Sequence, residues 1–145
     1  MTANPQRIQL PETYTTSSDS HVRLTNYPES ATCVTPIIVL TLNRPEKFNA
    51  MTGEMIESME TFFRQVDLDS HVKCVVMTGA GKAFCSGIDL NLNITAERQM
   101  PTAELRDIGG RLALAMFNCS KTVIVAYNGL AVGIGMTSTL AAGIR

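Results

Sequence analysis

The sequence lacks the features that usually mark a metal, membrane or nucleic-acid site. Its four cysteines form no CxxC pair, which excludes a zinc ribbon and a thioredoxin-like redox motif and indicates reduced, structural thiols. Its apolar runs are interrupted by Gly, Asn or Lys well before the length of a membrane-spanning helix. The net charge of -1 gives no electrostatic reason to bind nucleic acid or an anionic membrane. The composition that remains, 45% hydrophobic and 17% charged, is typical of a soluble globular protein.

Composition divides the chain into two parts. Residues 1–32 are rich in Thr, Ser, Asn and Pro, and we expect an irregular N-terminal arm with a short strand around His21 to Leu24. The start of this arm does not have the basic-then-apolar order of a secretory signal. Residues 33–145 are predicted to form one partial domain, with order beginning at Pro36.

Strands and helices are predicted to alternate after Pro36. Aliphatic and β-branched runs predict strands over residues 37–42, 74–78 and 122–127. A helix capped by Thr52 places its apolar residues at helical spacing and leaves Glu57, Ser58, Glu60 and Arg64 on a polar face. Further helices are predicted over residues 103–117 and from about Gly135. This order indicates an α/β layer with parallel strands, in which ligands bind beyond the carboxyl ends of the strands.

Two glycine-rich loops follow strand ends, over residues 79–90 and 128–135. Glycines let the backbone approach a ligand closely and expose its N–H groups. Two such N–H groups that converge on one point would stabilise an enolate-like oxygen without any side chain. Taken singly, each loop fits a tight structural turn better than a ligand site.

Other glycine motifs fit these loops poorly. A phosphate-binding P-loop would need Gly at Val76 and Ser or Thr at Ala83. A dinucleotide fingerprint would need its third glycine at Ser138, and a nucleophile elbow around Ser86 would need Gly at Phe84.

Three segments together are more specific. They read LNRPEKFNAM (residues 42–51), AFCSGIDL (83–90) and AYNGLAVGIG (126–135). In order and spacing they resemble successive signatures of the crotonase superfamily, the enoyl-CoA hydratases and isomerases. The resemblance implies a crotonase-like ββα spiral, truncated before its later turns and C-terminal helices. It also implies an acyl-CoA thioester substrate, with coenzyme A as part of the substrate, no other cofactor and no metal.

The resemblance assigns roles to residues of both loops. The peptide N–H groups of Ile88 and Ile134 would form the oxyanion hole. The segment from Ser86 to Leu90 would hold the thioester, and Lys47 to Ala50 would line the CoA. The substrate-binding residues so implied are Lys47, Asn49, Ala50, Ser86, Gly87, Ile88, Asp89, Leu90 and Gly133.

The sequence departs from the family pattern at Thr137. Hydratases of this family place a glutamate there, and a threonine hydroxyl is no general base near neutral pH. The wording of residues 131–137 is closer to the peroxisomal Δ3,Δ2-enoyl-CoA isomerase branch, which uses a single later carboxylate, beyond Arg145. Glu104 and Asp107 are weaker candidates for a base, and Asp89 is expected to brace the oxyanion loop.

Three functions therefore remain open. One is an enoyl-CoA isomerase or hydratase acting in β-oxidation or in an acyl-tailoring pathway of secondary metabolism. Another is a non-catalytic or decayed acyl-CoA-binding fragment. The third is a structural module that uses the fold without binding CoA.

For a full-length chain, the resemblance further implies a homo-oligomer, trimeric or hexameric. The net charge and the short apolar runs indicate no nucleic acid or membrane partner. The resemblance points to the peroxisome, with the cytoplasm as the alternative. The 145-residue chain alone is expected to be poorly soluble or partnered.

Overall fold

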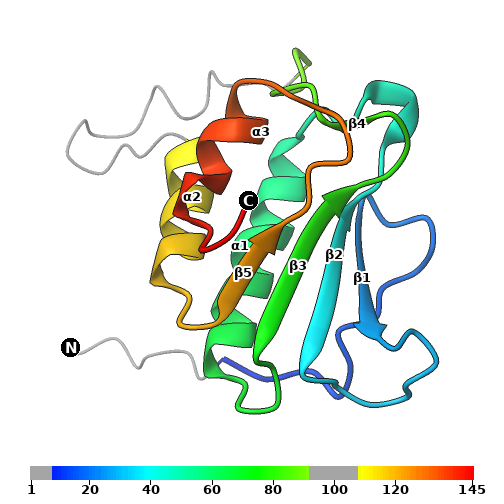
Figure 1. Ribbon diagram of the computed structural model, residues 1–145, viewed down its shortest axis with the longest axis vertical. Coiled ribbons are helices and arrows are strands. Elements are labelled where there is room, and N and C mark those ends of the chain that lie inside the picture. The colour runs from blue at the N-terminus through cyan, green and yellow to red at the C-terminus, as the bar shows by residue number, and fades with distance from the viewer. Residues whose placement is uncertain (1–7, 92–107) are drawn as a thin grey trace, which may run out of the picture.

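The computed structural model describes residues 8–91 and 108–145. Its main sheet has the strand order β1, β2, β3, β5, in which β1 runs antiparallel to β2 and the other neighbours are parallel. The strands are β1 (Val22–Tyr27), β2 (Ile37–Leu42), β3 (Cys74–Gly79) and β5 (Thr122–Val125). The three parallel strands end at the same edge of the sheet (Figure 1).

Helices and a second, smaller sheet complete the architecture. Helix α1 (Gly53–Leu68) lies behind the main sheet in Figure 1, and α2 (Ile108–Asn118) contacts α1. In the small sheet, β4 pairs with β6 in parallel. The remaining elements are β4 (Ala83–Cys85), β6 (Leu130–Ala131), α3 (Ile134–Thr137) and the 3-10 helices η1 (Pro45–Lys47) and η3 (Ser138–Ala141). The predicted α/β class with parallel strands is confirmed.

Burial alternates along the strands of the main sheet, and one face is almost fully buried. The register places Ile38 beside Val75 and Val75 beside Val123, and all three are almost fully buried. Leu40 and Met77 form part of the next row on the same face. Because side chains two residues apart share a face, these rows form one continuous apolar surface that faces the helices.

Helix α1 begins where the sequence predicts. The Thr52 side chain accepts a hydrogen bond from the main-chain N–H of Met55 at 3.2 Å, as an N-cap residue does. The prediction that Glu60 lies on a polar face is wrong, because Glu60 is 6% exposed. Its carboxylate is held between Arg64 at 3.4 Å and Arg111 of α2 at 3.2 Å. A buried carboxylate needs such partners, and α2, distant in sequence, supplies one of them.

Order begins earlier than the predicted Pro36. Strand β1 starts at Val22, close to the expected strand, and continues to Tyr27. Tyr14 is 3% exposed in the core, where its ring packs edge-on against Phe62. Its hydroxyl donates to Asp69 at 3.2 Å, so part of the predicted irregular arm is anchored to the body of the protein.

Other predicted boundaries shift by a few residues. The second predicted strand extends to Gly79, and the third stops at Val125. Only the part of the predicted helix 103–117 from Ile108 onward falls within the described residues, as does its continuation to Asn118. Within the described ranges, no helix combines the length and apolarity needed to cross a membrane.

Candidate functional site

The first functional segment follows β2 and is shaped by Asn49. Phe48 and Asn49 adopt left-handed backbone conformations, with φ of 49° and 57°, which asparagine tolerates better than most residues. The fully buried Asn49 side chain accepts from the Arg44 N–H at 2.8 Å. It donates to the carbonyls of Ala80 and Ala83 at 2.9 and 2.7 Å. This amide therefore ties residues 44–50 to the β3–β4 turn and has no polar atom left for a ligand.

The second segment carries Ile88 and pairs with Met51. The Met51 N–H donates to the Gly87 carbonyl at 2.8 Å, and the Asp89 N–H donates to the Met51 carbonyl at 2.8 Å. Because Met51 bonds to the residues on either side of Ile88, the N–H of Ile88 points away from Met51. No described residue accepts a hydrogen bond from it. Gly87 has φ of +114°, which permits this path of the backbone.

The third segment carries Ile134, the first residue of α3. Gly133 caps this short helix with φ of 53° and ψ of -122°, a conformation that side chains rarely adopt. The N–H of Ile134 belongs to the first turn, where helical donors have no intrahelical partner. Among the described residues it, too, finds no acceptor.

Cys85 joins the two loops that bear these N–H groups. Its carbonyl accepts from Val132 N–H at 2.9 Å, and its sulfur accepts from Gly87 N–H at 3.4 Å. A Cβ placed on Gly135 would lie 2.6 Å from the Cys85 Cβ, so only glycine lets α3 approach this closely. Burial raises the pKa of the Cys85 thiol and outweighs its hydrogen bond to the Gly87 backbone, which keeps the thiol protonated and inert. Sequence reasoning took this cysteine for a structural thiol and did not identify its place between the loops.

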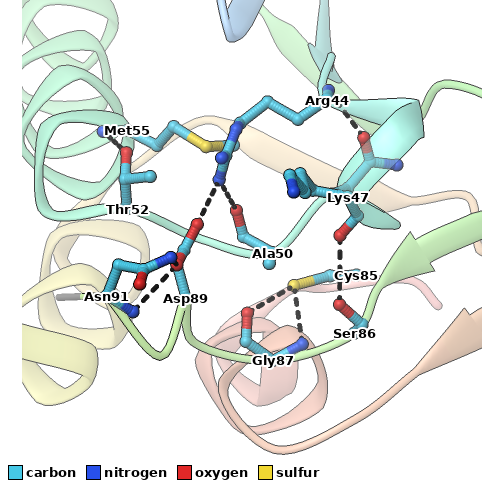
Figure 2. Close-up of polar contacts among 11 residues, drawn as sticks. Arg44, Lys47, Ala50, Thr52, Met55, Cys85, Ser86, Gly87, Asp89 and Asn91 are labelled. Atoms are coloured by element: carbon cyan, nitrogen blue, oxygen red, sulfur yellow. Dashed lines mark hydrogen bonds and ion pairs between the residues drawn. The ribbon is translucent and has the colours of Figure 1, made fainter.

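Asp89 braces the Ile88 loop, as expected. One carboxylate oxygen accepts from the N–H of Asn91 at 3.0 Å, and the other pairs with Arg44 at 2.9 Å. The hydrogen bond from Asn91 and that from Arg44 lower the pKa of Asp89 below its ordinary value. Figure 2 shows Arg44 reaching across to Asp89 and to the carbonyl of Ala50. Arg44 lies in the motif of residues 42–51, but its spacing in sequence gave no signal of this role.

The remaining predicted residues surround these loops. Lys47 is exposed, and its carbonyl accepts from the Ser86 hydroxyl at 3.4 Å. Leu90 is 96% exposed. Thr137 is exposed, and its hydroxyl makes no hydrogen bond to a described residue. Glu104 and Asp107 lie outside the described residues. No three His, Cys, Asp or Glu side chains of residues 8–91 and 108–145 are grouped so as to hold a metal ion.

Known proteins show the family of this chain and its fold. The family model for enoyl-CoA hydratase/isomerase matches residues 37–145, and the chain belongs to that family. It is 45% identical over 109 residues to the enoyl-CoA hydratase ACTT3 of Alternaria alternata, covering 75% of this chain and 36% of that protein. It is 36% identical over 116 residues to the 1,2-epoxyphenylacetyl-CoA isomerase of Escherichia coli K12, covering 74% of this chain and 42% of that one.

Solved structures show the crotonase fold. The crystal structure of a probable enoyl-CoA hydratase/isomerase from Mycobacterium abscessus superposes with a TM-score of 0.68 at 34% identity. The match covers 87% of this chain and 46% of that one. The chain thus spans less than half the length of these relatives. The resemblance read from the three motifs is confirmed at the level of the family and its fold.

Proposed function

We propose that this chain binds an acyl-CoA thioester and holds the thioester oxygen with the peptide N–H groups of Ile88 and Ile134. One observation carries the proposal: each N–H lies on a glycine-shaped loop, lacks an acceptor among the described residues, and is linked to the other through Cys85. Preorganised backbone donors stabilise the negative charge that develops on such an oxygen.

The reaction that fits this site is of the enoyl-CoA isomerase or hydratase type. A base would remove a proton alpha to the thioester carbonyl, and the two N–H groups would hold the enolate until the proton returns at the gamma carbon. A hydratase would instead add water to the double bond. The family description, enoyl-CoA hydratase/isomerase, supports both reactions, and the relative named as an enoyl-CoA hydratase supports the second. The pathway would be β-oxidation or the tailoring of an acyl chain.

The test combines binding with turnover. Calorimetry with a saturated acyl-CoA should show binding, and the same acyl group as a free carboxylate should bind far more weakly. Turnover of 3-enoyl-CoA and 2-enoyl-CoA then distinguishes isomerase from hydratase. Gly87→Ala and Gly133→Ala should abolish turnover, because both backbones need positive φ. Gly143→Ala is the matched control, since its added Cβ would meet only the Val123 carbonyl, at 3.8 Å. Absence of acyl-CoA binding would refute the proposal.

A second candidate function is acyl-CoA binding without catalysis, and the observation that favours it is Thr137. Its exposed hydroxyl stands where hydratases of the family carry a glutamate. Exchange of the alpha protons of a bound acyl-CoA in D₂O, followed by mass spectrometry, separates the two functions. Exchange indicates a working base, whereas tight binding without exchange indicates the non-catalytic function.

The assembly and the compartment are also proposals. We propose a homo-oligomer, trimeric or hexameric, which native mass spectrometry would test. We propose a peroxisomal location, supported by a 34% identical relative from Arabidopsis thaliana whose name places it in that organelle. Co-localisation of a fluorescent fusion with a peroxisomal marker would test this, and a diffuse cytoplasmic signal would contradict it.

A further inference from the structure

One guanidinium nitrogen of Arg44 joins two segments of the site. Its Nη1 donates to the Ala50 carbonyl at 2.7 Å and to the Asp89 carboxylate at 2.9 Å. The side chains of Arg44 and Asp89 are only 12% and 13% exposed. An ion pair so shielded from water is stronger and geometrically better defined than one on the surface.

These contacts lie on both sides of the oxyanion loop. Ala50 precedes Met51, whose N–H and carbonyl bond to Gly87 and Asp89. A further hydrogen bond, from Ser86 N–H to the Phe48 carbonyl at 2.9 Å, joins the two segments on the N-terminal side of Ile88. Ile88 therefore lies next to both segments that this nitrogen atom contacts. The dashed lines around Arg44 in Figure 2 mark its contacts with Ala50 and Asp89.

The rest of the guanidinium offers no competing anchor. Its Nε is buried and has no hydrogen-bond partner among the described residues. The pose of Arg44 is thus set by its two Nη1 contacts and by the attachment of its own N–H to Asn49. A buried donor left unpaired costs free energy, so Nε opposes this pose of Arg44 and the Nη1 contacts stabilise it.

We propose that Arg44 is a positioning residue that aims the N–H of Ile88 at the thioester oxygen. It does so by locking residues 47–51 and 86–89 into one unit. The inference rests on the proposed function, because it concerns the same oxyanion site. Donors stabilise a developing charge only when they are held in place beforehand. Loss of the Nη1 contacts leaves the segments folded but lets the Ile88 peptide rotate away from its target.

The readout is the polarisation of a bound carbonyl. A conjugated 2,4-dienoyl-CoA absorbs at longer wavelength when its thioester oxygen accepts strong hydrogen bonds. The full chain is saturated with this ligand, and the spectral shift is compared among wild type, Arg44→Met, Arg44→Lys and Asp89→Asn. Arg111→Met is the matched control, because it breaks another half-buried ion pair, with Glu60 at 3.2 Å.

The expected shifts form an order. Wild type and Arg111→Met give the full shift, even if Arg111→Met is less stable. Arg44→Met loses more than half of it, and Asp89→Asn loses less. Arg44→Lys recovers part of the loss, since an ammonium group can donate to at least one acceptor. Where the chain turns substrate over, kcat falls about tenfold to hundredfold in Arg44→Met with a smaller change in KM.

Each outcome decides the inference. A full shift in saturated Arg44→Met overturns it while the proposed function stands. Failure of wild type to bind the dienoyl-CoA overturns both. If Arg44→Met does not fold, Arg44→Lys and Asp89→Asn decide, and equal, undiminished shifts in those two variants also overturn the inference. In the unliganded protein, the Met51 and Asp89 amides should exchange faster with solvent in the folded Arg44 variants, whereas those of β3 should not. Unchanged exchange would contradict the proposed locking.

Discussion

At the scale of single residues, three glycines of this site are required for two different reasons. At Gly133 the backbone conformation requires glycine, with φ of 53°. Its size does not, because a Cβ there would meet no atom within 4 Å. Gly135 needs its small size, because its Cβ would overlap Cys85. Gly87 needs positive φ next to Ile88. The glycine-rich motif therefore meets a conformational requirement at Gly133 and a steric one at Gly135. Alanine substitutions at the two positions distinguish these requirements.

We expect Gly133→Ala to lower the free energy of unfolding by about 1–3 kcal/mol through backbone strain. Gly135→Ala should cost about 1–3 kcal/mol through overpacking against Cys85. Urea unfolding measures both. Gly143→Ala should change stability by less than about 1 kcal/mol. An equally large loss in that control would show that the effect is not specific to the loop.

Asn49 gives a second test at this scale. Asn49→Ala leaves the Arg44 N–H and two carbonyls without this partner and should cost about 2–4 kcal/mol in unfolding free energy. Asn49→Gly relieves the positive φ but not the lost hydrogen bonds, so it should recover only part of the loss. The control is Asn118→Ala, because Asn118 is exposed and its side chain forms no hydrogen bond with a described residue. Full recovery in the glycine variant would contradict the role of the amide.

At the scale of elements, the segment around Tyr14 is held by Asp69 at the end of α1. Asp69 is buried and accepts from Tyr14, from the His71 N–H and from the His71 ring. Burial alone would raise the pKa of Asp69, but the hydrogen bonds from His71 and Tyr14 outweigh it and lower the pKa. Burial and the neighbouring carboxylate raise the pKa of Tyr14, so its hydroxyl remains a donor.

The lowered pKa of Asp69 determines how the stability of the protein depends on pH. Because the pKa of Asp69 is lower in the folded than in the unfolded state, its contribution is complete above the unfolded value of about 3.9 and is lost as the pH falls through the folded pKa. Asp69→Asn should cost about 1–3 kcal/mol at pH 7, and the gap to wild type should narrow below about pH 4. Unfolding curves across this range measure it. Exposed Asp19→Asn is the control. A gap that widens on acidification would contradict the assignment.

At this scale, the sequence predicts the features that depend on residues close together in the chain. The strand β2 and the Thr52 cap depend on neighbouring residues and are predicted correctly. The burial of Glu60 depends on Arg111, and that of Tyr14 on Phe62 and Asp69, which are distant in sequence. The bond between Arg44 and Asp89 is of the same kind. None of these contacts changes the local pattern of apolar and polar residues from which secondary structure is predicted.

At the scale of the whole molecule, apolar surface remains uncovered. Val39, Val76 and Ile124 form a row across the outer face of the main sheet and are only partly buried. Parallel sheets are normally covered on both faces. Near the end of the chain, five apolar residues are each more than two-fifths exposed: Leu130, Val132, Met136, Leu140 and Ile144. Such surface favours association.

We therefore expect the 145-residue chain to self-associate. Light scattering coupled to gel filtration should show a mass that rises with concentration. Met136→Lys with Leu140→Lys should shift the protein toward monomer, because the substitutions place charge on exposed apolar positions. Leu10→Lys, at a comparably exposed residue near the start of the chain, is the control. A monomer that melts cooperatively at every concentration would contradict this prediction.

The sequence by itself determined the α/β order, the capped helix α1 and the family, because hydrophobic periodicity and short motifs are local properties of the chain. The roles of Ile88 and Ile134 come from the resemblance that these motifs carry, and they stay predictions. Tertiary structure alone decided that Cys85 lies between the two loops, that Asn49 has no free polar atom, and that Arg44 braces the segment around Ile88. These arrangements depend on contacts between residues that only folding brings together, and each depends on distances of a few ångströms.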